Sequence, residues 1–177
     1  QNLIGLTKLI RRNLELTDCL AVSLADELDF VDTYVKLERQ SLGSEFEYRL
    51  DLAEQLDLQE MKVPSMLLQI PVENAIKHGL RLKEGKRLLL IQVHKLENNQ
   101  VEIVICDNGG GYRINSANHG TGTGIKVILQ TIQLLNANNK KHIDISITNV
   151  QLEDGETGCE FAVFLPQGYD YNLKKMV

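Results

Sequence analysis

Apolar residues in the first forty positions recur every three or four residues, which is the spacing of amphipathic helices. This pattern predicts one helix over residues 2–15 and a second over about 24–40. Ser23 is placed to cap the second helix, with Asp26 three residues later, and Gly43 ends it. Because two helices alone cannot bury both apolar stripes, we expect this segment to pack on the rest of the chain or on another chain.

In the remainder of the chain, a two-residue alternation predicts several short strands. Residues 97–100 read as a hairpin connection and Asp154-Gly155 as a turn, whereas Leu16–Val22 reads as a connection between the first two helices. The predicted strands cover Phe46–Leu50, 87–96, 100–106, His142–Leu152 and Cys159–Leu165.

A third helix is predicted before the hairpin. Pro64 suits the first turn of a helix that runs to about His78 and stops at Gly79. Pro71 lacks a backbone N–H inside this span, which leaves open a later start near Gln69 or a bend.

A fourth helix is predicted over 124–136, after a polar, glycine-bearing segment at 112–123 that reads as a mobile loop. Strands and helices alternate without regular βαβ repeats, which favours an α+β fold with a mixed sheet and helices on one face. The residues of the fourth helix expected to face inward are Ile125, Ile128, Leu129 and Ile132.

Composition narrows the class of protein. The chain has 177 residues, of which 43% are hydrophobic and 24% charged, as in ordinary soluble domains. A net charge of −5 argues against a general nucleic-acid-binding surface, which is basic. Cys19, Cys106 and Cys159 are odd in number and far apart, which indicates free thiols in a reducing cytosol. The chain begins without Met inside a helical pattern, so we expect a fragment of a longer protein.

Residues 73–78 read Glu-Asn-Ala-Ile-Lys-His and follow an apolar run. At helical spacing, Asn74 and His78 lie on one face with Lys77 beside them. An amide oxygen suits Mg²⁺, and lysine and histidine can donate to phosphate oxygens. The alternative is a solvated polar face at the end of a helix.

Two glycine-rich stretches follow. Asp107 ends a strand and precedes Asn108 and three glycines, a combination that makes a turn but also lets backbone lie against a flat ring. Asp107 is placed to accept a hydrogen bond from the exocyclic amine of adenine. The glycines at 120–124 open a helix whose free N–H groups form an anion site, the alternative being a flexible loop. They fit neither the P-loop nor the dinucleotide fingerprint.

Together these stretches resemble the ATP-binding domain of bacterial sensor histidine kinases, and Val72 to Gly79, Val-Glu-Asn-Ala-Ile-Lys-His-Gly, reads as in the LytS-type subfamily. The resemblance implies the Bergerat fold, a two-layer sandwich of a mixed sheet with helices on one face. It also implies that residues 1–43 are a helical segment similar to the end of the dimerisation and phosphoacceptor module. Residues 44–177 would then be the ATP-binding catalytic domain.

The resemblance further implies roles for individual residues. Asn74 would be the Mg²⁺ ligand and Asp107 the adenine contact, and Glu73, Lys77 and His78 would be the candidates for catalytic groups. Cys159 stands where the family usually has threonine. The remaining residues implied to contact ATP are Lys77, His78, Gly109, Gly111, Gly120, Gly122, Thr123, Gly124 and Cys159.

The implied reaction is phosphoryl transfer from Mg-ATP to a histidine that this chain lacks, since it contains no Asn-Pro-His-Phe motif. The implied partners are a response regulator and the phosphoacceptor-histidine module of a homodimeric full-length protein. We expect no nucleic acid partner, a cytoplasmic fragment without membrane contact, and a full-length protein anchored in the bacterial inner membrane.

Two alternatives stay open. An ATP hydrolase of the same superfamily would carry a general-base glutamate four residues before Asn74, where this chain has Ile70. A nucleotide-free interaction module with the same fold is the other, although the complete set of motif residues argues against it.

Overall fold

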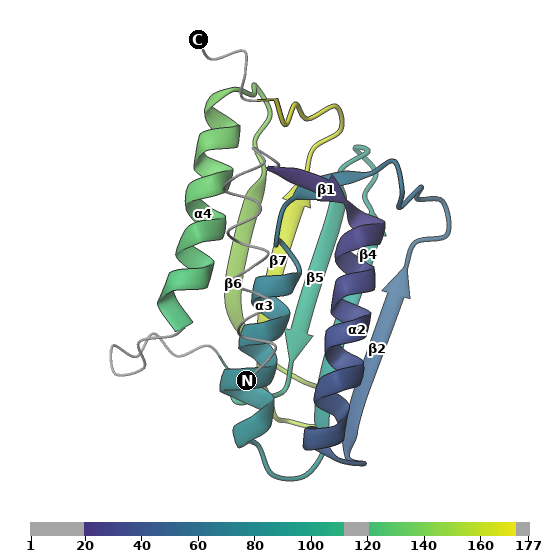
Figure 1. The fold of residues 1–177 in the computed structure, drawn as a ribbon, viewed down its shortest axis with the longest axis vertical. Coiled ribbons are helices and arrows are strands. Elements are labelled where there is room, and N and C mark those ends of the chain that lie inside the picture. Colours follow the sequence, from purple (N-terminus) through teal and green to yellow (C-terminus); the bar gives the residue numbers. More distant parts are fainter. Residues whose placement is uncertain (1–19, 112–120, 173–177) are drawn as a thin grey trace.

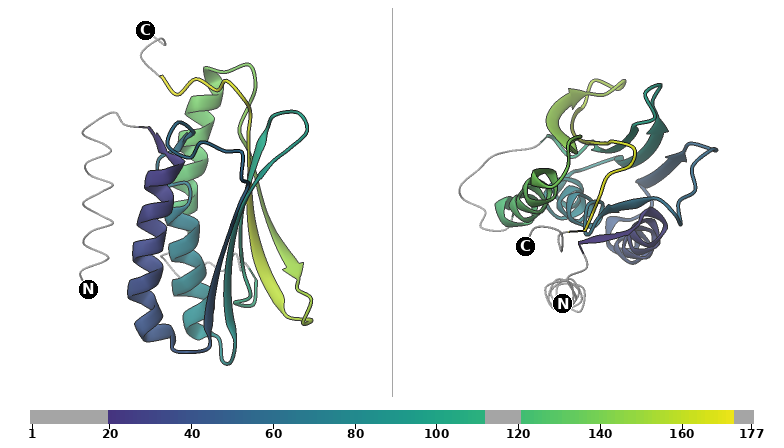
Figure 2. Two further views of the ribbon diagram at one scale, coloured as in Figure 1. Left: turned by 90° about the vertical axis from the view of Figure 1, so that its right-hand side faces the viewer. Right: turned by 90° about the horizontal axis from the view of Figure 1, so that it is seen from above.

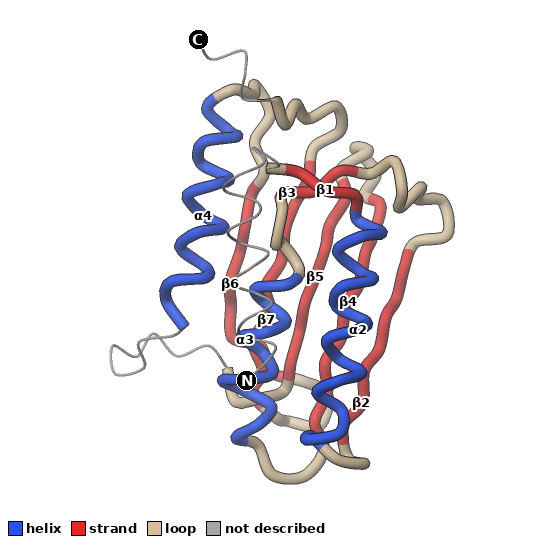
Figure 3. The backbone as a smooth tube through the Cα atoms, in the orientation of Figure 1, coloured by secondary structure: helices blue, strands red, loops and turns tan. Residues whose placement is uncertain are grey.

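A five-stranded mixed sheet forms one layer of the protein (Figures 1 and 3). The structure is a computed structural model that describes residues 20–111 and 121–172. The strand order is β2-β4-β5-β7-β6, with β2 and β4 parallel and all other neighbours antiparallel. The bounds are β2 Phe46–Leu52, β4 Arg87–Lys95, β5 Val101–Asp107, β6 Asp144–Gln151 and β7 Thr157–Leu165.

Helices form the second layer, and Figure 2 shows them on one face of the sheet. They are α2 (Leu24–Leu42), α3 (Gln69–Asn74) and α4 (Thr121–Ala137). A π-helical turn, η1 (Ala75–Gly79), and a 3₁₀ turn, η2 (Leu80–Leu82), continue α3. The predicted α+β, two-layer fold is therefore confirmed.

The core lies between the two layers. Alternate residues of β4, namely Leu89, Ile91 and Val93, are fully buried, as expected for a strand with one face covered. Val31 and Ile76 meet them from the helical layer in the same apolar cluster. Each such side chain stabilises the fold by about 1.5–3 kcal/mol through burial.

The segment predicted as Leu16–Val22 is not wholly a connection. Ala21–Ser23 form strand β1, which pairs antiparallel with β3, Lys62–Pro64. Strands of three residues are too short for alternation to reveal them, so the prediction was wrong here. Pro64 consequently ends a strand and does not open a helix.

The later start predicted as an alternative for the third helix is the correct one, since α3 begins at Gln69. Pro71 then falls in the first helical turn, where backbone N–H groups have no partner within the helix. Gly79 does not stop the helical path, which continues through η2 to Leu82.

The caps of α2 are confirmed. The backbone N–H of Asp26 donates to Ser23 Oγ at 3.1 Å, and Gly43 ends the helix with φ of 81°. The predicted 2–15 helix lies outside the described residues. The second helix packs into the same apolar cluster as the sheet, as expected, while a domain boundary after residue 43 stays a prediction.

α4 starts at Thr121, inside the segment predicted as a loop, whose other residues lie outside the described part. Leu129 is 43% exposed, so its predicted inward orientation was wrong. Leu135 is buried instead, because it continues the stripe of Ile125, Ile128 and Ile132 at three- and four-residue spacing.

The predicted hairpin and turn are confirmed. Leu96 and Gln100 close the connection between β4 and β5, with the Leu96 N–H donating to the Gln100 carbonyl at 2.8 Å. Gly155 has φ of 77° in the turn between β6 and β7, which favours glycine. Among the described residues, no helix has the length and apolar character needed to cross a membrane.

Candidate functional site

A cavity of about 600 Å³ opens between the helical layer and the ends of the central strands. Its walls come from α3 and its continuation, from the end of β5, from the first turns of α4 and from β6 and β7. The lining residues are Pro71, Asn74, Ala75, His78, Gly79, Leu82, Lys83, Ile105, Asp107, Asn108, Gly109, Gly110, Gly111, Ile125, Ile147, Glu156, Thr157, Cys159 and Phe161.

Asp107 is the buried carboxylate of this cavity. It is the last residue of β5, is 7% exposed and pairs across the sheet with Cys159. The backbone N–H of Gly109 donates to Asp107 Oδ1 at 2.8 Å. Burial raises the pKa of Asp107 to about 6, and the Gly109 hydrogen bond opposes this shift. At neutral pH the site therefore presents a poorly solvated negative charge that a donor on a ligand can stabilise.

Asn74 and His78 line the cavity from the helical side. The Nδ2 atom of Asn74 is buried and has no hydrogen-bond partner among the described residues. Burial, together with the neighbouring Lys77 charge, lowers the pKa of His78, so its imidazole is neutral at pH 7. One amide and one neutral imidazole therefore face the same space as the Asp107 carboxylate.

Two glycines let the helical segment touch the loop after β5. A Cβ atom on Gly109 would lie 2.5 Å from Gly79 Cα and 2.9 Å from Asp107 Oδ1. Such distances are far shorter than any ordinary contact. Gly111 has φ of 89° and approaches the side chain of Asn149 on β6. The wall beside Asp107 is therefore made of bare backbone.

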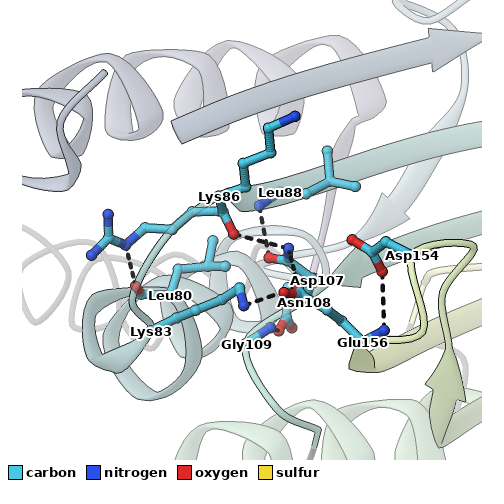
Figure 4. A network of polar contacts seen from close by, with 10 residues as sticks. Leu80, Lys83, Lys86, Leu88, Asp107, Asn108, Gly109, Asp154 and Glu156 are labelled. Carbon is cyan, nitrogen blue, oxygen red and sulfur yellow. Dashed lines mark hydrogen bonds and ion pairs between the residues drawn. The ribbon is translucent and has the colours of Figure 1, made fainter. Parts of the chain in front are cut away.

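Asn108 fixes this loop, as Figure 4 shows. Its Oδ1 accepts from the Leu88 N–H at 2.8 Å, and its Nδ2 donates to the Lys86 carbonyl at 3.1 Å and to Glu156 Oε2 at 2.9 Å. Glu156 also forms an ion pair with Lys83 at 2.9 Å. The network holds the backbone around Asp107 in place from three segments of the chain.

Lys83, Glu156 and Thr157 also line the cavity and were missed by the sequence reasoning. Lys83 lies in a connecting turn, where no periodic pattern marks a side chain as inward. Glu156 and Thr157 immediately precede Gly158-Cys159, so their position beside the closing strand was the available signal.

The structure brings together six of the predicted site residues in the cavity lining: Asn74, His78, Asp107, Gly109, Gly111 and Cys159. Gly122, Thr123 and Gly124 lie in the first turn of α4, directly before the lining residue Ile125. Gly120 lies outside the described residues.

Glu73 and Lys77 are not among the residues that line the cavity. Lys77 Nζ lies 3.9 Å from Glu73 Oε2, and Glu73 is buried. The negative charges of Glu38 and Glu73 add to the burial that raises the pKa of Tyr34 on α2, which places Glu73 near that helix. A catalytic role for either residue stays a prediction.

The Asp107 end and the Asn74 end of the cavity differ in chemistry, so they suit different parts of a ligand. Near Asp107 it offers a carboxylate, bare backbone and the apolar side chains of Ile105 and Phe161, which suit a flat ring with an amine. Within the described residues, no group of three or more His, Cys, Asp or Glu side chains is arranged to hold a metal. If a metal ion bound beside Asn74, water and the substrate would supply most of its ligands, as is usual for Mg²⁺.

Sequence comparison finds relatives among sensor kinases, although no family model matches. The chain is 29% identical to sensor protein LytS of Oceanobacillus iheyensis over 80% of its own length, and 32% identical to sensor histidine kinase YpdA of Escherichia coli over 63%. The chain is thus similar in sequence to LytS-type sensor histidine kinases. It spans 26% and 19% of the lengths of these two proteins.

Solved structures agree on the fold. The mycobacterial sensor histidine kinase MprB superposes with a TM-score of 0.55 at 16% identity, over 82% of this chain and 97% of that one. The catalytic domain of histidine kinase ThkA gives a TM-score of 0.54 at 12% identity, over 86% and 97% of the two chains. The resemblance to a histidine kinase catalytic domain is thus confirmed at the level of the fold.

The buried charge of Asp107 predicts a pH-dependent effect on stability in the absence of nucleotide. Its folded-state pKa of about 6 lies above the ordinary value of 3.8, so ionisation destabilises the folded state increasingly as pH rises from 4 to 6. We expect Asp107→Asn to raise the free energy of unfolding by about 1–3 kcal/mol above pH 6 and to have no such effect below pH 4. Urea unfolding between pH 4 and pH 8 measures this.

The control is Asp144→Asn, which removes one negative charge from an exposed position on β6. This variant measures how much the free energy of unfolding changes when one exposed negative charge is removed from a chain whose net charge is −5. If Asp107→Asn raises the free energy of unfolding equally at pH 4 and pH 8, or does not raise it at all, the Asp107 carboxylate does not destabilise the fold through its buried charge.

The Gly79–Gly109 contact predicts that a single methyl group disrupts the site. Gly109→Ala places Cβ against the Gly79 backbone and against Asp107 Oδ1, so the loop must move. We expect a loss of about 1–3 kcal/mol in unfolding free energy, as for other overpacked positions. Cavity geometry should change with it, visible as shifted amide resonances for Asp107 and Gly79.

Gly85→Ala is the matched control. Gly85 has φ of 78° and open space around its would-be Cβ, so alanine there introduces backbone strain without a collision. We expect it to lower stability and leave the amide resonances of Asp107 and Gly79 in place. Equal resonance changes in both variants would show that the close contact is unimportant.

Proposed function

We propose that this chain binds ATP with Mg²⁺ in the cavity and positions the terminal phosphate for transfer to a histidine on another segment or chain. The observation that carries the proposal is the meeting of Asp107, Asn74 and the bare backbone at Gly109 in one cavity. These groups come from two separate stretches of sequence, and each has the chemistry that a different part of Mg-ATP requires.

In this proposal the base lies at the Asp107 end of the cavity. The carboxylate accepts a hydrogen bond from the six-amino group of adenine, which stabilises its charged form. The wall of glycine backbone leaves room for the ring, and Phe161 and Ile105 contribute apolar surface. Cys159 replaces the threonine usual in the family, so a hydroxyl-mediated contact at this position is absent.

The phosphates lie toward Asn74 and the first turn of α4. Asn74 would be the protein ligand of Mg²⁺, and its buried amide without a partner on Nδ2 fits a group that is completed by a ligand. The amide's oxygen and nitrogen positions are interchangeable by rotation, so the oxygen can face the metal. Mg²⁺ would neutralise charge on the phosphates, and His78 would donate one hydrogen bond to a phosphate oxygen.

Phosphoryl transfer asks little covalent chemistry of the protein, because the reaction depends on alignment and on charge stabilisation. The free N–H groups at the start of α4, around Gly122 to Gly124, favour negative charge at that end of the helix. Lys77, which pairs with Glu73, would reach the phosphates only after a change of side-chain conformation.

The proposal includes partners outside this chain. The phosphoacceptor histidine would come from the dimerisation module of a homodimeric protein, and a response regulator would receive the phosphoryl group. We extend the proposal to a full-length protein anchored in the bacterial inner membrane, with this part of it in the cytoplasm. These elements rest on the family relationship.

An ATP hydrolase of the same superfamily is less well supported. The position of its general base, four residues before Asn74, is held by Ile70, which is apolar and 1% exposed. Glu73 does not line the cavity. No described carboxylate therefore takes the place of that base.

Calorimetric titration with Mg-ATP tests the proposal directly. Saturable binding of one nucleotide per chain is expected, and the same titration with AMP should be weaker because AMP lacks the phosphates that contact Mg²⁺. Absence of binding by the folded protein would favour the nucleotide-free interaction module.

The metal assignment predicts a selective loss in Asn74→Ala. We expect the affinity for Mg-ATP to fall about tenfold or more, which corresponds to about 1.4 kcal/mol, while the affinity for ATP with excess EDTA stays the same. Gln130→Ala, which removes an exposed amide from α4, is the control. A folded Asn74→Ala protein with undiminished Mg-ATP affinity would rule out Asn74 as the ligand.

The base assignment predicts a preference for ATP over GTP. Guanine presents a keto oxygen where adenine has an amine, so Asp107 would lose its partner, at a cost of about 1–3 kcal/mol. We expect ATP to bind roughly tenfold or more tightly than GTP, and the preference to shrink in Asp107→Asn, since an amide can face either group. Competition of both nucleotides against a fluorescent ATP analogue measures it, and equal affinities in the wild-type protein would contradict the assignment.

A further inference from the structure

Glu27 is a buried carboxylate on α2, 6% exposed, that contacts the start of a different helix. It accepts backbone hydrogen bonds from Met66 at 2.7 Å, from Leu68 at 3.3 Å and from Gln69 at 3.3 Å. All three donors lie within or just before the first turn of α3. The two helices lie side by side on the sheet (Figures 1 and 2).

The beginning of α3 has no local substitute for this carboxylate. Leu68 is the residue before the helix and gives no side-chain hydrogen bond, and the first turn contains no acidic residue. Met66 has φ of 68°, an unusual conformation for a residue with a side chain. The first N–H groups of a helix need partners when they are buried, and Glu27 supplies them from a residue distant in sequence.

This arrangement differs from the cap of α2, which is made locally by Ser23. A local cap ends a helix but leaves its position in the fold free. A cap from another helix also fixes where α3 starts and how it is rotated about its axis. Burying a carboxylate is unfavourable unless it is hydrogen-bonded, so the three N–H groups and Glu27 depend on each other.

The position of α3 matters because the helix carries Asn74. Asn74 is five residues beyond Gln69, which is about 7.5 Å along a helix. Pro71, in the same helix, also lines the cavity. A shift or rotation at the start of α3 therefore moves the Asn74 amide, whereas Asp107 on β5 is held by the Asn108 network.

We propose that Glu27 is a positioning residue for the metal end of the nucleotide site, acting through the backbone at the start of α3. The proposal rests on the function proposed above and adds a residue of α2 to it. It divides the site into two halves that meet at the Gly79–Gly109 contact but have different supports: α3, held by Glu27, for the metal and phosphates, and the loop after β5, held by Asn108, for the base.

Glu27→Gln tests this with little change of shape. Glutamine keeps one acceptor oxygen but turns an amide NH₂ toward backbone N–H groups, so the set of three hydrogen bonds cannot be kept. We expect the gain in ATP affinity on adding Mg²⁺ to fall about tenfold or more, since displacements near 1 Å have large effects at such sites. Adenosine affinity, which depends on the Asp107 end, should stay within twofold. Calorimetry on protein shown to be folded by circular dichroism measures both.

A second readout needs no nucleotide. Amide hydrogen exchange in the ligand-free protein should become faster for Gln69, Ile70 and Val72 in Glu27→Gln, with Asp107 and Asn108 unchanged. Ser23→Ala is the matched control, because it also removes a helix cap, but from α2. It should lower the melting temperature and leave both the Mg²⁺-dependent gain and the exchange of α3 as in the wild-type protein.

The outcomes are distinguishable. A wild-type chain that does not bind ATP overturns the proposed function, and this inference with it. A wild-type chain that binds Mg-ATP, together with a folded Glu27→Gln protein that keeps the full Mg²⁺-dependent gain, overturns only the role of Glu27. An unfolded Glu27→Gln protein also contradicts it, because the carboxylate would then hold the whole domain and not one helix. Equal losses of adenosine and Mg²⁺-dependent affinity would contradict the division into two halves.

Discussion

The candidate site depends on a contact between two stretches of bare backbone, at Gly79 and Gly109. Here the helical segment that follows α3 meets the loop that follows β5 so closely that no side chain fits between them. The contact brings the helical layer down onto the end of the sheet and sets the distance between Asn74 and Asp107. The apolar core holds the layers together, but this contact decides how near their functional groups come.

The charge of Asp107 shows how stability and binding oppose each other in this protein. A carboxylate buried at the end of β5 with a pKa raised to about 6 is unfavourable in the empty fold at neutral pH. A donor on a ligand removes much of that disadvantage. The same property that makes the free protein less stable therefore makes binding of a suitable base more favourable.

Much of this could be predicted from sequence. Asp107 and Gly109 were recognisable because they follow an alternating strand, and Asn74 and His78 because a polar cluster ends an apolar helix. The start of α3 could not be predicted uniquely, since its cap comes from Glu27, a residue that nothing in the local pattern connects to it. Lys83 and Glu156 were not predicted for a different reason: both lie in turns, where no periodic pattern marks a side chain as inward.

The order of the strands has a consequence for how the protein folds. β2 pairs with β4 in parallel, so Phe46 must find Arg87 across an intervening strand and helix, and β5 pairs with β7 across the segment that contains α4 and β6. Contacts of such long sequence separation form slowly, because the loops must close before the contacts can stabilise them. Asp107 and Cys159 come together in one of these long-range pairings, so neither the β4–β5 hairpin nor the β6–β7 hairpin can form this wall of the cavity alone.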